Sequence, residues 1–129
     1  VPTAPANNSP YANALVSDFT PTLIGSAFKD DALGGVQTAS EWRIYNSSST
    51  LVYDSGIDAA DLTSLTVPAN KLTAGNSYKW DVRYEDNYGD WSSYSPFTTF
   101  SAVAVPEPSA IGWLLAGAVF CQRRRRREA

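Results

Sequence analysis

Two acidic stretches hold the side chains with the plainest capacity for chemistry. Asp30 and Asp31 are adjacent in FKDDALGGVQ, and Asp86 and Asp90 stand four residues apart in EDNYGD. Carboxylate oxygens suit Ca²⁺, but neither stretch has the D-x-D-x-D-G spacing that surrounds this ion with ligands. A carboxylate pair could also serve a glycosidase, which needs a cleft that shields one acid from water. We expect both stretches to be solvated acidic turns, without a metal or a cofactor.

The rest of the composition removes most enzyme chemistry. The chain contains no histidine and a single cysteine, Cys121. It therefore lacks the usual ligand sets of zinc sites and the histidine of a catalytic triad, and it cannot form an internal disulfide. We expect no catalytic residue in the chain, so any catalytic domain would have to lie upstream of Val1.

Three aromatic residues crowd one connection near the end of the body of the chain. Tyr88, Trp91 and Tyr94 could stack on the sugar rings of an exopolysaccharide if their faces were exposed. The same rings could instead pack onto the edge of neighbouring strands, and a large indole is usually mostly buried. We expect Trp91 to pack against the sheets, and we keep carbohydrate contact as the alternative.

Short strand-like runs separated by clusters of Gly, Asn, Asp, Ser and Pro make up the body, which predicts an all-β fold. The clearest run is SYKWDVRYE at residues 77–85, where aromatic or aliphatic side chains alternate strictly with charged ones from Tyr78 onward. Such alternation is typical of an antiparallel sandwich strand with one buried and one solvated face. Trp42 and Ile44 alternate with charged residues in the same way. The residues expected inside are Trp42, Ile44, Tyr78, Trp80 and Val82, and those expected to be exposed are Lys79, Asp81 and Arg83.

One motif in the body resembles a known family. Residues 72–78, LTAGNSY, followed by Trp80 and Val82, resemble the fibronectin type III pattern L-x-P-G-T-x-Y-x-x-x-V, with Ala74 and Asn76 at the proline and threonine positions. The resemblance implies an immunoglobulin-like (fibronectin type III-like) antiparallel β-sandwich. It also implies a tyrosine corner, in which the Tyr78 hydroxyl bonds to the upstream backbone.

The C-terminal tail resembles a sorting signal. Pro106, Glu107 and Pro108 precede an apolar run at residues 109–122, and five arginines follow it: Arg123, Arg124, Arg125, Arg126 and Arg127. This order is similar to the PEP-CTERM signal of Gram-negative bacteria. The resemblance implies that exosortase, a membrane protease-transpeptidase, recognises the tripeptide and removes the rest. It also implies an exported protein of a biofilm or exopolysaccharide system.

The physical properties of the tail agree with a transient anchor. As a helix, residues 109–122 would span about 21 Å, which is less than the roughly 30 Å hydrocarbon core of a bilayer. The arginines that follow would stay on the cytoplasmic side by the positive-inside rule and leave the acidic body outside. Cys121 would then be either another small residue of this short hydrophobic helix or a site of acylation.

These observations divide the chain into a linker (1–16), a sandwich (17–102) and a sorting signal (103–129). The body is acidic, and half of the ten basic residues are the tail arginines, so we expect no nucleic-acid partner. The expected function is a non-enzymatic structural or spacer module, anchored briefly in the inner membrane and then placed on the outer surface or in the extracellular matrix. Alternatives are a carbohydrate-binding module and, more distantly, an accessory domain of an upstream enzyme.

Overall fold

The computed structural model describes residues 1–104, which form eight strands and no helix. The all-β prediction is therefore confirmed for this part of the chain, in which no helix could span a membrane. The predicted C-terminal helix, Pro106, Glu107, Pro108, Cys121 and the arginines at 123–127 lie outside the described residues. The strands are β1 (Asn7–Ser9), β2 (Ala14–Val16), β3 (Thr22–Gly25), β4 (Gln37–Asn46), β5 (Leu51–Asp54), β6 (Ser64–Thr66), β7 (Ser77–Asp86) and β8 (Thr98–Ala102).

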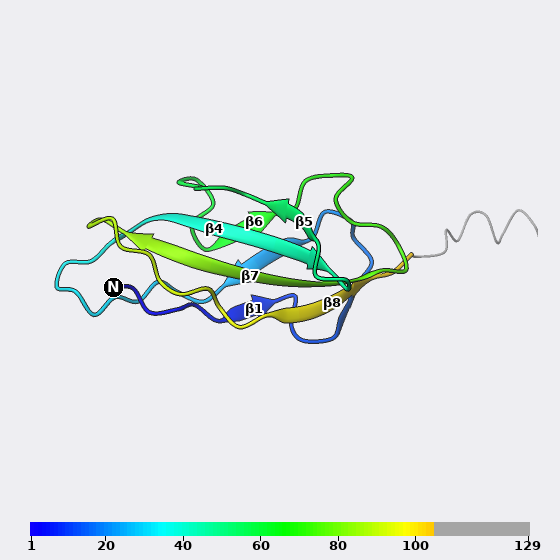
Figure 1. Ribbon diagram of the computed structural model, residues 1–129, viewed down its shortest axis with the longest axis horizontal. Helices are drawn as coiled ribbons and strands as arrows, with labels where there is room; N and C mark the ends of the chain where they lie inside the picture. Colours follow the sequence, from blue (N-terminus) through cyan, green and yellow to red (C-terminus); the bar gives the residue numbers. More distant parts are fainter. Residues whose placement is uncertain (105–129) are drawn as a thin grey trace, which may run out of the picture.

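The strands form two sheets. One has the order β1-β3-β6, and the other has the order β2-β8-β7-β4-β5. Figure 1 shows that β4 and β7 run along most of the molecule, and the two strands pair with each other inside the larger sheet. All pairs are antiparallel except β2 and β8, which run in the same direction, so the larger sheet is mixed.

The core lies between the sheets and is built mainly from β4 and β7. Trp42 of β4 and Trp80 of β7 stack with ring centroids 6.0 Å apart, and both are fully buried. Leu23 and Leu65 close the core from the smaller sheet. All five residues predicted to lie inside are buried, as expected from the alternation of side chains along a strand.

The tyrosine corner is also confirmed. Tyr78 is buried, and its hydroxyl oxygen accepts a 2.8 Å hydrogen bond from the backbone N–H of Thr73, five residues upstream. Its ring stacks on Phe100 of β8 with centroids 5.7 Å apart. Between Thr73 and Tyr78, Gly75 adopts φ +86°, which favours a residue without a Cβ. The corner thus fixes the turn that leads into β7.

The prediction that residues 1–16 are only a linker is wrong. This segment supplies β1 to the smaller sheet and β2 to the larger one. The Asn7 side chain donates hydrogen bonds to the Trp80 carbonyl (3.0 Å) and to the Thr98 hydroxyl (3.0 Å). The first residues of the chain therefore belong to both sheets and bond to partners that lie far along the sequence.

Candidate functional site

The connection between β7 and β8, residues 87–97, runs alongside β7. The backbone N–H groups of Ser92 and Ser95 donate to the carbonyls of Tyr84 and Val82, both at 2.8 Å. Their hydroxyls accept hydrogen bonds from the N–H groups of the same two residues, both at 3.0 Å. Ser92 and Ser95 are buried, and each satisfies both backbone groups of its partner. The WSSYS stretch thereby places Trp91 and Tyr94 beside β7.

Two ion pairs cross the outer face of β4 and β7 between residues that stand directly opposite each other. The Arg43 guanidinium donates to both carboxylate oxygens of Asp81, at 3.0 and 2.6 Å. The Arg83 guanidinium donates twice to one oxygen of Glu41, at 3.0 and 2.7 Å. The hydrogen bond that Arg43 donates to Asp81 raises the pKa of Arg43 further above its usual value. Both arginines are held in place by their carboxylate partners.

The aromatic rings of the connection stack on these guanidinium groups. The central carbon of the Arg43 guanidinium lies 3.4 Å from the Tyr94 ring centroid and 5.4 Å from that of Tyr45. The Arg83 carbon lies 4.3 Å from the Trp91 centroid and 4.9 Å from that of Tyr94. These are cation–π distances. We call these five residues, Trp91, Arg83, Tyr94, Arg43 and Tyr45, the arginine ladder.

The arginine ladder overturns one sequence prediction. Asp81 was expected to be exposed, but only 2% of its surface is accessible. Lys79 and Arg83 are half-buried rather than fully exposed. The outer face of β7 is covered by the arginines and by the connection that follows the strand, so Asp81 is enclosed together with its partner. The sequence signal that could have revealed this cover is the pair of serines, Ser92 and Ser95, because their hydroxyls bond to the backbone of β7.

The three aromatic residues predicted as carbohydrate contacts lie in two places. Trp91 packs against β7, as expected, with Arg83 on its ring. The Tyr94 hydroxyl donates a 2.7 Å hydrogen bond to Glu41, and burial and this carboxylate raise the pKa of Tyr94. Tyr88 is exposed, and its hydroxyl donates to the Leu33 carbonyl at 2.9 Å. The ladder therefore uses the rings of Trp91 and Tyr94 for packing, and Tyr88 stands apart from them.

The two acidic stretches meet at one end of the molecule. Asp86 accepts hydrogen bonds from the N–H groups of Tyr88 and Asp90, both at 2.9 Å, and Asp30 accepts one from Ala32 at 3.0 Å. Both side chains are buried, so the prediction of solvated turns is wrong for Asp30 and Asp86, whose carboxylates cap their own turns. Asp31 and Asp90 are exposed. Within residues 1–104, no group of three or more Cys, Asp or Glu is arranged to hold a metal ion.

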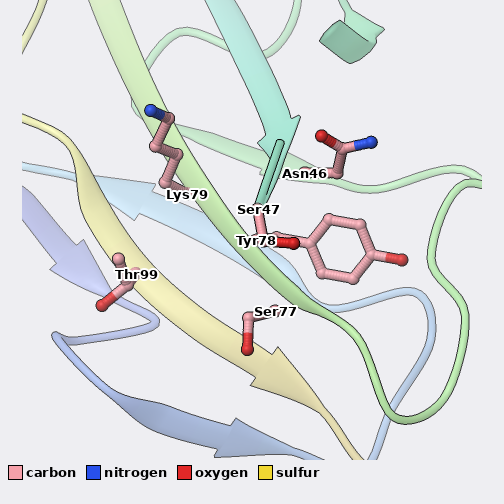
Figure 2. Close-up of a pocket in the computed structure, with 6 residues that line it drawn as sticks. All are labelled: Asn46, Ser47, Ser77, Tyr78, Lys79 and Thr99. Carbon is pink, nitrogen blue, oxygen red and sulfur yellow. The ribbon is translucent and has the colours of Figure 1, made fainter. Parts of the chain in front are cut away.

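One hollow of about 240 Å³ lies where β4 ends and β7 begins, and Figure 2 shows its lining. The surface that it exposes is almost entirely apolar, although most of its residues carry hydroxyl or amide groups. The stem of Lys79 forms part of this wall, and the Lys79 amine donates a 3.0 Å hydrogen bond to Ser49. No carboxylate lines this hollow. The lining residues are Asn46, Ser47, Ser77, Tyr78, Lys79 and Thr99.

Comparisons with known proteins show which family and which structures this chain is similar to. The family model for the Rha78A-like, N-terminal immunoglobulin domain matches residues 12–105. None of the curated proteins matches the chain. The α-L-rhamnosidase from Dictyoglumus thermophilum is 21% identical, with a TM-score of 0.64 over 74% of this chain and 12% of that one. The Streptomyces avermitilis α-L-rhamnosidase complexed with L-rhamnose is 23% identical, with a TM-score of 0.65 over 79% and 10%.

A smaller structure is similar over nearly its whole length. CopC from Methylosinus trichosporium OB3b is 21% identical, with a TM-score of 0.50, and the match covers 80% of this chain and 97% of that one. At these identities the three structures show a shared fold and not a shared activity. The chain spans about a tenth of the length of the two rhamnosidases that it matches.

Proposed function

The chain belongs to the family of Rha78A-like N-terminal immunoglobulin domains, and on this basis we propose that it is a non-enzymatic accessory module that acts as a spacer in an exported protein. In the two rhamnosidases, the matched region is a small part of a much longer chain. A module of this size and fold can support other parts of a protein without doing chemistry itself.

The observation that carries the spacer proposal is the path of the chain. The N-terminus lies near one end of the longest axis, and β8 runs out toward the opposite end (Figure 1). Whatever is joined to the two ends is therefore separated by the length of the sandwich. The outer face between them is closed by the arginine ladder, whose charges are paired within the domain. These features favour a rigid separating element over a binding surface.

The sequence of the tail supports a finer proposal for where the module goes. Exosortase would recognise Pro106, Glu107 and Pro108 while the apolar run holds the chain in the inner membrane, with the arginines at 123–127 on the cytoplasmic side. Removal of the tail would then release the sandwich to the outer surface or the matrix. The acidic body fits an exported location, because the positive-inside rule keeps basic segments, and not acidic ones, on the cytoplasmic side.

Glu107→Ala is expected to leave the sandwich folded but to stop removal of the tail in a host that contains the exosortase. Intact mass spectrometry of the surface-released protein measures this, because an unprocessed species retains the five arginines. Glu128→Ala is the matched control, since it removes the other glutamate of the tail without touching the tripeptide. Equal processing of the two variants would refute the sorting proposal.

A spacer is expected to show no saturable binding to the exopolysaccharide of the producing organism. Isothermal titration of the full chain in detergent measures this directly. Should the wild-type chain bind, Trp91→Ala and Tyr88→Ala separate the two groups of rings, with thermal unfolding as the check on folding. Saturable binding that is lost in either folded variant would replace the spacer by a carbohydrate-binding module.

The family match favours a second candidate, an accessory domain of a longer enzyme that acts on glycosides. In that case catalysis would reside in another domain of a longer chain, because the matched region makes up only about a tenth of the two rhamnosidases. The size of the native protein, measured by immunoblotting with an antibody against the sandwich, distinguishes this candidate from a small separate module.

A further inference from the structure

We propose that one side of the sandwich, beside the point where the tail leaves it, lies on the lipid surface of the membrane. Three large apolar side chains would make the contact: Tyr11, Leu15 and Phe19, which we call the exit patch. This inference rests on the proposed function, because it requires the tail to be a membrane anchor.

The three side chains of the exit patch are exposed. The accessible fractions of Tyr11, Leu15 and Phe19 are 69%, 73% and 38%. Tyr11 and Leu15 border a shallow groove of about 360 Å³, and Asp18, which also lines it, is the only charged residue in the first 28 positions. Leu15 lies on β2, the strand at the edge of the larger sheet. Tyr11 and Leu15 therefore place two exposed apolar side chains at one groove, with Phe19 four residues after Leu15, and exposed apolar side chains at one site favour a contact surface.

The sheet holds the start of the tail next to this patch. Val16 of β2 stands opposite Ala102 of β8, and the N–H of Val103 donates a 2.9 Å hydrogen bond to the Val16 carbonyl. The apolar run begins at residue 109, only six residues after Val103. An extended chain covers at most about 3.6 Å per residue, so Val103 stays within about 22 Å of the bilayer once the run is inserted. The exit patch is held beside Val103 through Val16, the neighbour of Leu15 on β2.

The charges of the domain favour the same orientation. β7 ends at Asp86, near the end of the molecule where the chain begins (Figure 1). The N–H of Asp90 donates to the Asp86 carboxylate, and the Asp30 and Asp31 carboxylates lie 3.7 and 2.9 Å from the N-terminal amine, so all four belong to this acidic end. Anionic headgroups repel such a cluster and thus turn it away from the membrane. Tyrosine and other large apolar side chains are favoured in the interface between lipid and water. The exit patch then faces the lipid.

The test uses the full chain in vesicles of phosphatidylethanolamine and phosphatidylglycerol. A fluorophore on Cys121, the only native cysteine, reports insertion of the tail through quenching by lipids labelled deep in the acyl chains. Two further variants, Leu15→Cys and Leu33→Cys, are made in a Cys121→Ser background and probed with lipids labelled at the headgroup. Leu33 is the matched control because it is 97% exposed and belongs to the acidic end.

We expect the probe at position 15 to be quenched several-fold more than the probe at position 33. Equal quenching at the two positions, with the Cys121 probe quenched, would overturn the exit patch and leave the anchor intact. An unquenched Cys121 probe would instead overturn the anchor and the patch with it. A probe at position 15 that is already shielded without vesicles would show that a second copy covers the patch, and would also overturn the proposal. Tyr11→Cys repeats the test if Leu15→Cys does not fold.

Discussion

Replacing Arg43 with methionine is expected to lower the free energy of unfolding by about 3–5 kcal/mol, because it leaves a buried carboxylate without its partner. Asp81 receives two hydrogen bonds from Arg43 and has almost no access to water. Methionine keeps the apolar stem but supplies neither charge nor donors. Unfolding in urea, followed by tryptophan fluorescence, measures the change.

The second ion pair of the ladder provides the control. Arg83→Met should cost only about 1 kcal/mol, the net value of an ordinary hydrogen bond, because Glu41 is more accessible and keeps the hydrogen bond from the Tyr94 hydroxyl. Replacing Arg43 and Asp81 together by methionine and leucine should recover much of the loss, since no unpaired charge then remains. Equal losses for Arg43→Met and Arg83→Met would contradict the special burial of Asp81.

Gly25→Ala is expected to destabilise the fold by about 3 kcal/mol, at the upper end of the usual cost of overpacking. A Cβ at this position would overlap the hydroxyl of Tyr84 and lie 3.3 Å from its ring carbon Cζ. Tyr84 cannot simply move away, because it is fully buried and its hydroxyl donates a 2.8 Å hydrogen bond to the Ser26 carbonyl. The close contact joins the end of β3 to the last part of β7.

The Tyr84→Phe background separates this overlap from other effects of the added methyl group. Removing the hydroxyl alone should cost about 1 kcal/mol, and the double variant should be more stable than the sum of the single losses predicts. Burial also raises the pKa of Tyr84 to about 12, so an absorbance titration should show earlier ionisation when Gly25→Ala displaces the phenol. Strict additivity of the two substitutions would rule out the overlap.

The buried face of β7 could be predicted from the sequence because alternation is a local property of a strand. Tyr78, Trp80 and Val82 each point inward for the same geometric reason. The same pattern failed at Asp81, since alternation says on which side a residue lies and not what covers that side. The cover depends on how residues 91–97 return along β7, which a single strand does not reveal.

The short strands β1 and β2 and the burial of Asp30 and Asp86 could not be predicted from the alternation of side chains. β1 and β2 contain three residues each, too few to show a period, and they are stabilised by β3 and β8, which lie far along the chain. Asp30 and Asp86 belong to turns that are distant in sequence, so their common burial follows from the packing of two loops. The tyrosine corner was predictable because Thr73 and Tyr78 lie within one motif.

The parallel pairing of β2 with β8 affects how the module would respond to tension. One of these strands belongs to the beginning of the domain and the other to its end, and they run side by side in the same direction. When the two ends of the chain are pulled apart, the strands are drawn in opposite directions along their common axis. The bonds between them, including those from Asn13 to Thr99 and from Val103 to Val16, are then loaded in shear and must break together. A hairpin at the same place would open one bond at a time, so this arrangement lets the domain carry a pulling force before its tryptophan core is disturbed.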